Sequence, residues 1–96
     1  MLNLKAVKDT LLIHKQRLRL KYGLKSLGIF GSYARNQQTD ESDLDILVEF
    51  DKPIGVEFID LADELEQLLL VKIDLVSKKG IKDKYLKLIE KELEYV

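Results

Sequence analysis

The chain has 96 residues and no cysteine, and its 16 Lys and Arg nearly balance its 17 Asp and Glu. This length supports one small core, so we expect a single domain over residues 1–96 with no separate substrate-binding domain. The absence of a general basic field disfavours nucleic acid as the primary ligand, and the absence of cysteine excludes disulfides and thiolate metal sites. With no signal peptide or membrane span visible, we expect a cytoplasmic protein that has no membrane partner.

The first predicted element is an amphipathic helix over residues 4–22, with Gly23 as its stop. One apolar stripe runs along it, formed by Leu4, Val7, Leu11 and Leu18. His14, the only histidine, falls on this stripe. We interpret it as a packed or edge residue rather than a catalytic one, because histidine is often found at intermediate burial.

A short apolar strand is predicted next, over residues 24–30, and it ends in the turn Gly31-Ser32. Glycine lets the backbone approach a ligand closely, and Ser32 can cap a short helix at residues 33–35. Free amides, the helix dipole and a hydroxyl at such a turn suit a triphosphate, although a Gly-Ser turn alone is more often a plain helix cap. Arg35 could contact a phosphate or pair with a carboxylate, and both interpretations stay open.

The strand predicted over residues 43–50 carries a pair of acids on one face. Apolar residues alternate with Asp43 and Asp45, so that one face is buried and both carboxylates point the other way. Two adjacent carboxylates repel each other, and a divalent cation is the ordinary way to keep both ionised. Oxygen-only ligands favour magnesium or manganese over zinc.

A third acid follows a turn at residues 51–55 and a helix predicted over residues 56–69. Asp74 lies on the strand predicted over residues 72–77, which reaches the same ions if it neighbours the strand of residues 43–50. Three acids could then share two ions in a phosphoryl or nucleotidyl displacement, with Asp74 as the general base. A solvated strand face is the alternative interpretation of these acids.

The last predicted element is a helix over residues 81–93. Its expected buried residues are Ile81, Tyr85, Leu88 and Ile89. A lysine cluster precedes and begins it, and we interpret this cluster as a solvated surface more readily than as an anion site: Lys78, Lys79, Lys82 and Lys84.

These elements predict an α/β fold, α+β-like in its mixed sheet, with the order α-β-α-β-α-β-α. The crossover helix makes the second and third strands parallel neighbours, and the first strand pairs antiparallel. We expect the helices to cover the sheet face opposite the acids.

The chain resembles the minimal nucleotidyltransferase (MNT) family of the DNA polymerase beta-like superfamily, over nearly its whole length. The motif is a Gly-Ser, a spacer of about ten residues, an Asp-x-Asp on the next strand and a further Asp on the strand after. Here these positions are Gly31-Ser32, Asp43, Asp45 and Asp74. One departure is Asn36, where many members have glycine; asparagine tolerates the left-handed backbone, so the turn should survive.

The resemblance implies a nucleotidyltransferase fold and roles for these residues. In the family the three acids bind two magnesium ions, with manganese possible, and the third acid also activates the acceptor. The Gly-Ser turn holds the nucleoside triphosphate, and Arg35 is the further candidate for nucleotide binding. Members of the MntA type act as antitoxins by transferring AMP from ATP to a tyrosine of a partner HEPN toxin, so the same function is implied here.

Two other functions remain open from the sequence. Nucleotidyl transfer could be directed to a small molecule or an RNA end. The chain could also mask its partner by contact, as a non-catalytic antitoxin with a site that binds nucleotide without turnover. Intact Asp43, Asp45 and Asp74 argue against a decayed site but do not exclude sequestration.

Overall fold

A computed structural model describes residues 2–96, which form one mixed sheet with helices on both sides. The described elements, in chain order, are α1 (Leu4–Tyr22), β1 (Leu24–Phe30), α2 (Gly31–Ala34), β2 (Leu44–Phe50), α3 (Glu57–Leu69), β3 (Ile73–Ser77), the 3₁₀ turn η1 (Lys78–Gly80), α4 (Asp83–Glu90) and β4 (Glu94–Tyr95). Among the described residues, no helix combines the length and the apolar character needed to cross a membrane.

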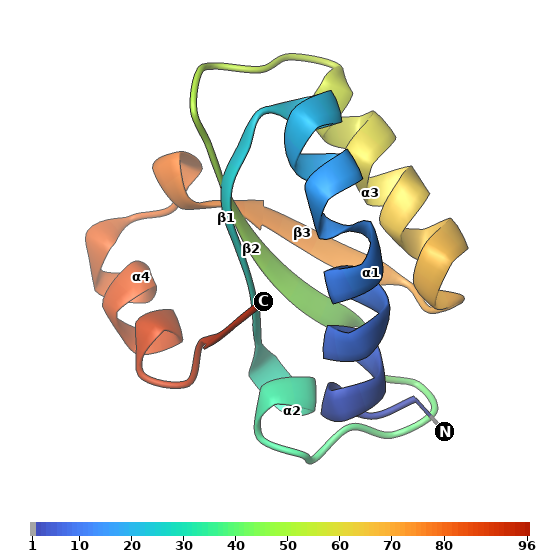
Figure 1. The fold of residues 1–96 in the computed structure, drawn as a ribbon. Coiled ribbons are helices and arrows are strands. Elements are labelled where there is room, and N and C mark those ends of the chain that lie inside the picture. Colours follow the sequence, from blue (N-terminus) through green and yellow to red (C-terminus); the bar gives the residue numbers. More distant parts are fainter. Residues whose placement is uncertain (1) are drawn as a thin grey trace.

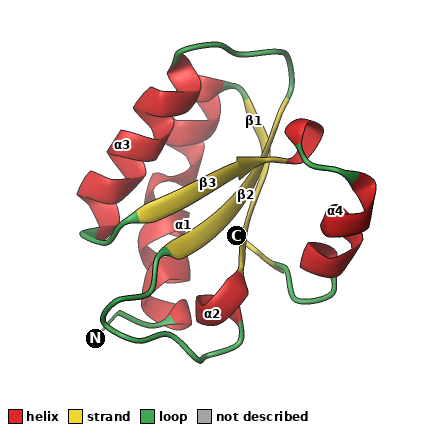
Figure 2. Cartoon of the chain, turned by 180° about the vertical axis from the view of Figure 1, so that it is seen from behind, coloured by secondary structure: helices red, strands yellow, loops and turns green. Residues whose placement is uncertain are grey.

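The sheet has the strand order β3-β2-β1-β4. β1 pairs antiparallel with both β2 and β4, whereas β2 and β3 are parallel and are joined by the crossover helix α3. The predicted fold class and the pairing of the first three strands are therefore confirmed. Figure 2 shows β2 and β3 running side by side in the same direction, with α2 next to the start of β2.

The main core lies between the sheet and the two long helices. α1 and α3 cover one face of the sheet (Figure 1), where α1 buries Val7, Leu11 and Leu18 and α3 buries Leu61 and Leu65. The strands meet them with a common set of buried residues: Leu24, Leu27, Ile29, Leu44, Ile46, Val48 and Ile73. The alternate residues Leu44, Ile46 and Val48, which were predicted to form the buried face of β2, therefore lie in the core.

Both ends of α1 are explained by local chemistry. The Asn3 side chain accepts a hydrogen bond from the Ala6 N–H at 2.8 Å, which caps the first turn. Gly23 adopts a left-handed backbone with φ of 68° and donates its N–H to the Arg19 carbonyl, so the expected stop is confirmed. His14 is partly buried on this helix, at the edge of the apolar stripe.

The end of the chain differs from the prediction. The last helix spans only Asp83–Glu90, none of its residues is buried, and Tyr85 and Leu88 are 50% and 59% exposed. Helical spacing shows which residues share a face, but it does not show that anything covers that face. Residues 91–93, which were expected to continue the helix, instead form a turn that leads into β4. β4 pairs with the outer edge of β1, and next to it the Val96 N–H donates to the Leu27 carbonyl at 3.0 Å.

The position of α4 also departs from the expected layering. Figure 1 shows it on the opposite side of the sheet from α1 and α3. Asp45 and Asp74 each follow a buried residue of their strand, so they point to the side of the sheet away from the core. The link after α4 reaches the sheet at Gly28, where a Cβ would lie 2.7 Å from Leu93 Cδ1. The glycine therefore leaves the space that Leu93 occupies beside β1.

A polar cluster joins α1 to α3 outside the core. Glu64 of α3 accepts hydrogen bonds from Arg17, from Lys21 at 3.1 Å and from the Tyr22 hydroxyl at 2.7 Å. The Arg17 and Tyr22 hydrogen bonds lower the pKa of Glu64 to about 2, and the Glu64 side chain is only 17% exposed. Burial, followed by the hydrogen bond to Glu64, raises the pKa of Tyr22 to about 12.

This cluster predicts a loss of stability in acid. Because the pKa of Glu64 is lowered by folding, its contribution is complete above the ordinary value of 4.5 and disappears as the pH falls toward about 2. Glu64→Gln should lower the free energy of unfolding by about 1–2 kcal/mol at pH 7, or roughly 5–10 °C in Tm. Thermal melts from pH 7 to pH 2 should show this difference shrinking below pH 4.5.

The matched control is Asp63→Asn, which removes a neighbouring charge that makes no ion pair within residues 2–96. A Glu64→Gln variant whose Tm deficit persists unchanged at pH 2 would show that packing, and not the charge, is the source of the effect.

Candidate active site

Two of the predicted acids lie side by side on adjacent strands. The parallel register of β2 and β3 places Asp45 directly opposite Asp74, and the charge of Asp74 is near enough to raise the pKa of Asp45. Asp45 is partly buried and Asp74 is exposed. The structure therefore brings these two acids together as the strand pattern predicted.

The environment of Asp45 disfavours its ionised form. Burial is the largest cause, followed by the charge and hydrogen bond of Asp74 and by the charges of Asp43 and Glu92, and together they raise the pKa of Asp45 to about 6. A carboxyl group with such a pKa among other acids is a common feature of functional sites.

Gly31 is in direct contact with the Asp45 carboxylate. A Cβ at this position would lie 2.0 Å from Asp45 Oδ2, and the backbone φ of Gly31 is 74°. Any side chain here would therefore collide with the acid as well as strain the backbone. The expectation was that glycine lets the backbone approach a ligand, and the structure adds a second reason for glycine, which is the packing of the turn onto the acid.

The expected role of Ser32 as a helix cap is wrong. α2 begins at Gly31, and its N-cap is Phe30, which has an extended backbone and forms no side-chain cap hydrogen bond. Ser32 lies inside the helix because the turn enters it directly from β1. The Ser32 hydroxyl makes no hydrogen bond to any residue from 2 to 96 and lies one residue from the glycine that contacts Asp45. The predicted contact of the Ser32 hydroxyl with phosphate does not depend on a capping role and stays a prediction.

Arg35 forms an ion pair, which is one of the two interpretations left open by the sequence. Its Nη1 donates to Glu92 Oε2 at 2.7 Å and its Nε donates to Gln37 Oε1 at 3.0 Å. The next residue, Asn36, has a φ of 58°, so the left-handed backbone expected there is confirmed.

Asp43 immediately precedes β2 and is exposed. A tight turn leads into it, in which the Ser42 N–H donates to the Thr39 carbonyl at 3.1 Å and the Thr39 N–H donates to Ser42 Oγ at 2.9 Å. Asp43 is near enough to raise the pKa of Asp45. All three predicted acids therefore gather at the start of β2 and β3.

The donor set fits a hard divalent cation. The groups near Asp45 are carboxylates, which are the ligands that magnesium and manganese prefer, and a cation would relieve the repulsion that raises the pKa of Asp45. Asp45 and Asp74 form a pair, and Asp43 lies nearby. Among residues 2–96, no three acidic or histidine side chains are already arranged to hold one metal ion.

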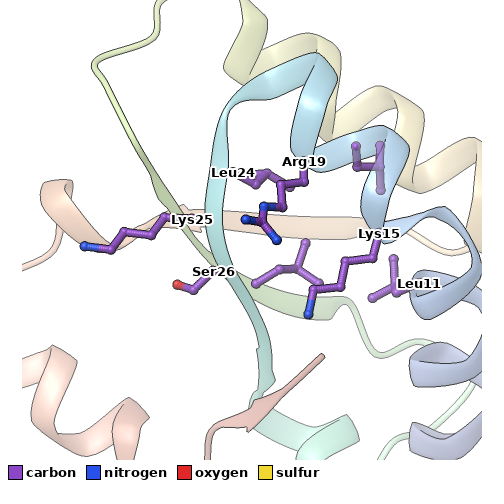
Figure 3. A pocket seen from close by; sticks show the side chains of 8 residues that line it. Leu11, Lys15, Arg19, Leu24, Lys25 and Ser26 are labelled. Atoms are coloured by element: carbon purple, nitrogen blue, oxygen red, sulfur yellow. The ribbon is translucent and has the colours of Figure 1, made fainter.

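Two hollows of the surface lie away from these acids. One between α1 and β1 holds about 20 Å³, room for about one water. Figure 3 shows the Arg19 side chain extending from α1 toward β1, whereas the Lys25 side chain points away from α1. A groove of about 740 Å³ lies at the far ends of β2 and β3, beside α4. Asp43 and Asp74 are exposed, so the acid site is open to solvent.

Comparison with known proteins supports the geometry. Residues 11–96 match the nucleotidyltransferase domain family. The chain belongs to this family. It is therefore an enzyme of the nucleotidyltransferase class, and the acid pair lies within the matched domain.

Close relatives are archaeal. A Methanocaldococcus jannaschii protein provisionally named a protein adenylyltransferase is 53% identical over 92 residues, which is 94% of each chain. Protein adenylyltransferase MntA of Thermococcus cleftensis is 40% identical over 97 residues, covering 100% of this chain and 98% of that protein.

Solved structures share the fold of this nucleotidyltransferase. One provisionally described as a minimal nucleotidyltransferase has a TM-score of 0.82 at 27% identity, with 99% of this chain and 95% of that chain covered. A chain from a complex of tri-AMPylated Shewanella oneidensis HEPN toxin with MNT antitoxin has a TM-score of 0.69 at 20% identity, with 93% and 70% covered. At that identity the second likeness shows the fold alone.

Sequence reasoning missed Glu92 and Gln37, the partners of Arg35. Glu92 fell inside the segment assigned to the last helix, so no role was considered for it. A signal was present, because the polar and apolar residues of Glu92-Leu93-Glu94-Tyr95 alternate with the period of a strand.

The contact between Gly31 and Asp45 predicts that Gly31→Ala damages both stability and the site. The variant must accept a left-handed alanine and a clash with Asp45, so we expect about 2–3 kcal/mol of destabilisation. Displacement of Asp45 should also weaken magnesium-dependent ATP binding, measured by calorimetric titration.

Gly23→Ala is the matched control for this experiment. Gly23 has a similar φ of 68°, but a Cβ there would meet nothing within 4 Å. It should show only the strain, about 1 kcal/mol, with normal ATP binding. Equal losses in the two variants would mean that the Asp45 contact contributes nothing.

Proposed function

We propose that this nucleotidyltransferase is an antitoxin that transfers AMP from ATP to a tyrosine hydroxyl of a partner HEPN toxin. The observation that carries the proposal is the Asp45–Asp74 pair beside the Gly31 turn. Further support comes from the relatives named as protein adenylyltransferases and from the complex in which the HEPN toxin is AMPylated. A protein acceptor also agrees with the exposure of Asp43 and Asp74.

The residues divide between the two substrates. Gly31 and Ser32 would hold the triphosphate at the start of α2, and Arg35 would contribute a cation to it. Asp43, Asp45 and Asp74 would hold two magnesium ions, or manganese, which when bound would stabilise the charge that develops on the transferred phosphoryl group.

The transfer itself exchanges one P–O bond for another. The acceptor oxygen forms a bond to the α-phosphorus of ATP while the bond to the bridging oxygen of the β-phosphate breaks, and pyrophosphate leaves with that electron pair. The proton of the hydroxyl passes to Asp74, which is exposed on the edge strand of the sheet and so can be reached by an acceptor.

The direct test is co-expression with a HEPN partner followed by intact mass measurement of that partner. The wild-type protein should add the mass of AMP, and Asp43→Asn or Asp45→Asn should reduce the rate of transfer by at least about a hundredfold. Asp45→Asn should stay folded, because it removes a charge that its surroundings already disfavour.

Asp51→Asn, just beyond the other end of β2, is the control and should transfer normally. A tight complex with an unmodified partner would instead support sequestration, and near wild-type transfer by both site variants would exclude the assigned acids.

Asp74 is expected to separate binding from chemistry. If it serves the attacking hydroxyl, Asp74→Asn should abolish transfer and retain much of the magnesium-dependent ATP binding, since Asp43 and Asp45 remain. Calorimetric titration with magnesium and ATP, run beside the mass assay, measures both. Equal loss of both would assign Asp74 to the nucleotide, and loss of neither would place it outside the site.

A further inference from the structure

Two acceptors fix the guanidinium of Arg35. Gln37 accepts from Nε at 3.0 Å and Glu92 accepts from Nη1 at 2.7 Å, whereas Nη2 has no partner among residues 2–96. Arginine presents five N–H donors in a rigid plane, so two fixed contacts set the direction of the remaining donors. Free donors therefore remain on a side chain whose orientation is already determined.

Glu92 is held in place by the residues that follow it. Leu93 fills the space left by the missing side chain of Gly28, and Glu94 and Tyr95 pair with the outer edge of β1. β1 also leads directly into α2 and hence to Arg35. The same strand thus positions both members of the ion pair.

The ion pair borders the acid site. Arg35 lies one residue beyond the helix that begins at Gly31, and the charge of Glu92 reaches Asp45. If the Glu92 carboxylate were unpaired, its negative charge would repel a triphosphate bound nearby. Paired with Arg35, it is neutralised, and it lowers the entropy that the arginine must lose when it contacts a phosphate.

We infer that Glu92, together with Gln37, is a positioning residue that holds the Arg35 guanidinium ready for the phosphates of the bound nucleotide. The inference rests on the proposed function, in which Arg35 contacts the triphosphate. The contact that Glu92 makes here is with Arg35, so the inference has it act on the nucleotide through Arg35.

The test is the affinity of the full chain for magnesium and a non-hydrolysable α,β-methylene analogue of ATP, measured by calorimetric titration. Glu92→Ala should raise Kd by about 3–10-fold, and Glu92→Gln, which can still accept the hydrogen bond, should raise it less. In the transfer assay KM should rise with kcat nearly unchanged. The Tm should hardly move, because an ion pair between partly exposed side chains contributes little to stability; the exposed fractions are 48% for Arg35 and 27% for Glu92.

A double-mutant cycle distinguishes an effect through Arg35 from a general one. Added to Arg35→Ala, Glu92→Ala should weaken binding no further. The control is Glu94→Gln. It removes a negative charge two residues after Glu92, from a side chain that pairs with Lys8, and it should leave Kd unchanged.

Unchanged binding by Glu92→Ala would overturn the inference, and so would tighter binding, which would show that Glu92 competes with the phosphates. Either result would leave the proposed function standing. Further weakening in the Arg35→Ala background would also overturn the inference. Failure of the wild-type protein to bind the analogue would instead count against the proposed function.

Discussion

The backbone pairing of β1 along both of its edges is the constraint on which the site depends. One edge pairs with β2 and sets Asp45 opposite the end of β1, where Gly31 packs onto its carboxylate. The other edge pairs with β4 and places Glu92 beside Arg35. Hydrogen bonds between backbones thus fix side chains whose own contacts are few, which is how so small a domain can hold an open site in a defined geometry.

The acids make this geometry costly. Asp45 is partly buried among like charges, and the rise of its pKa to about 6 expresses the work of ionising it there. Between α1 and α3 the ionised form of a carboxyl is favoured instead. Glu64 accepts hydrogen bonds from Arg17, Lys21 and Tyr22, and its pKa falls to about 2. The pKa values of Asp45 and Glu64 are therefore shifted in opposite directions. Asp45, whose ionised form is disfavoured, is the one that lies where chemistry is expected.

Most of the fold could be predicted because its signals are local. The period of β2, the stop at Gly23 and the left-handed Asn36 each follow from the residues themselves. The neighbouring positions of Asp45 and Asp74 also followed, since a crossover helix makes the strands parallel. The cap at Ser32 and the burial of Tyr85 and Leu88 were wrong, because they depend on how the chain enters α2 and on what covers α4, and neither is encoded nearby. Glu92 escaped notice because its partner Arg35 is far away in the sequence, although the alternation around Glu92 indicated a strand.

That distance has a consequence for the order of folding. Contacts between remote parts of a chain carry a larger loop-closure entropy and tend to form after local ones. β4 pairs over only two residues, Gly28 with Tyr95 and Ile29 with Glu94, so it adds little buried surface to pull it into place early. The core of α1, α3 and the three longer strands can therefore assemble first, and the arginine beside the acids acquires its carboxylate partner only when the last strand docks.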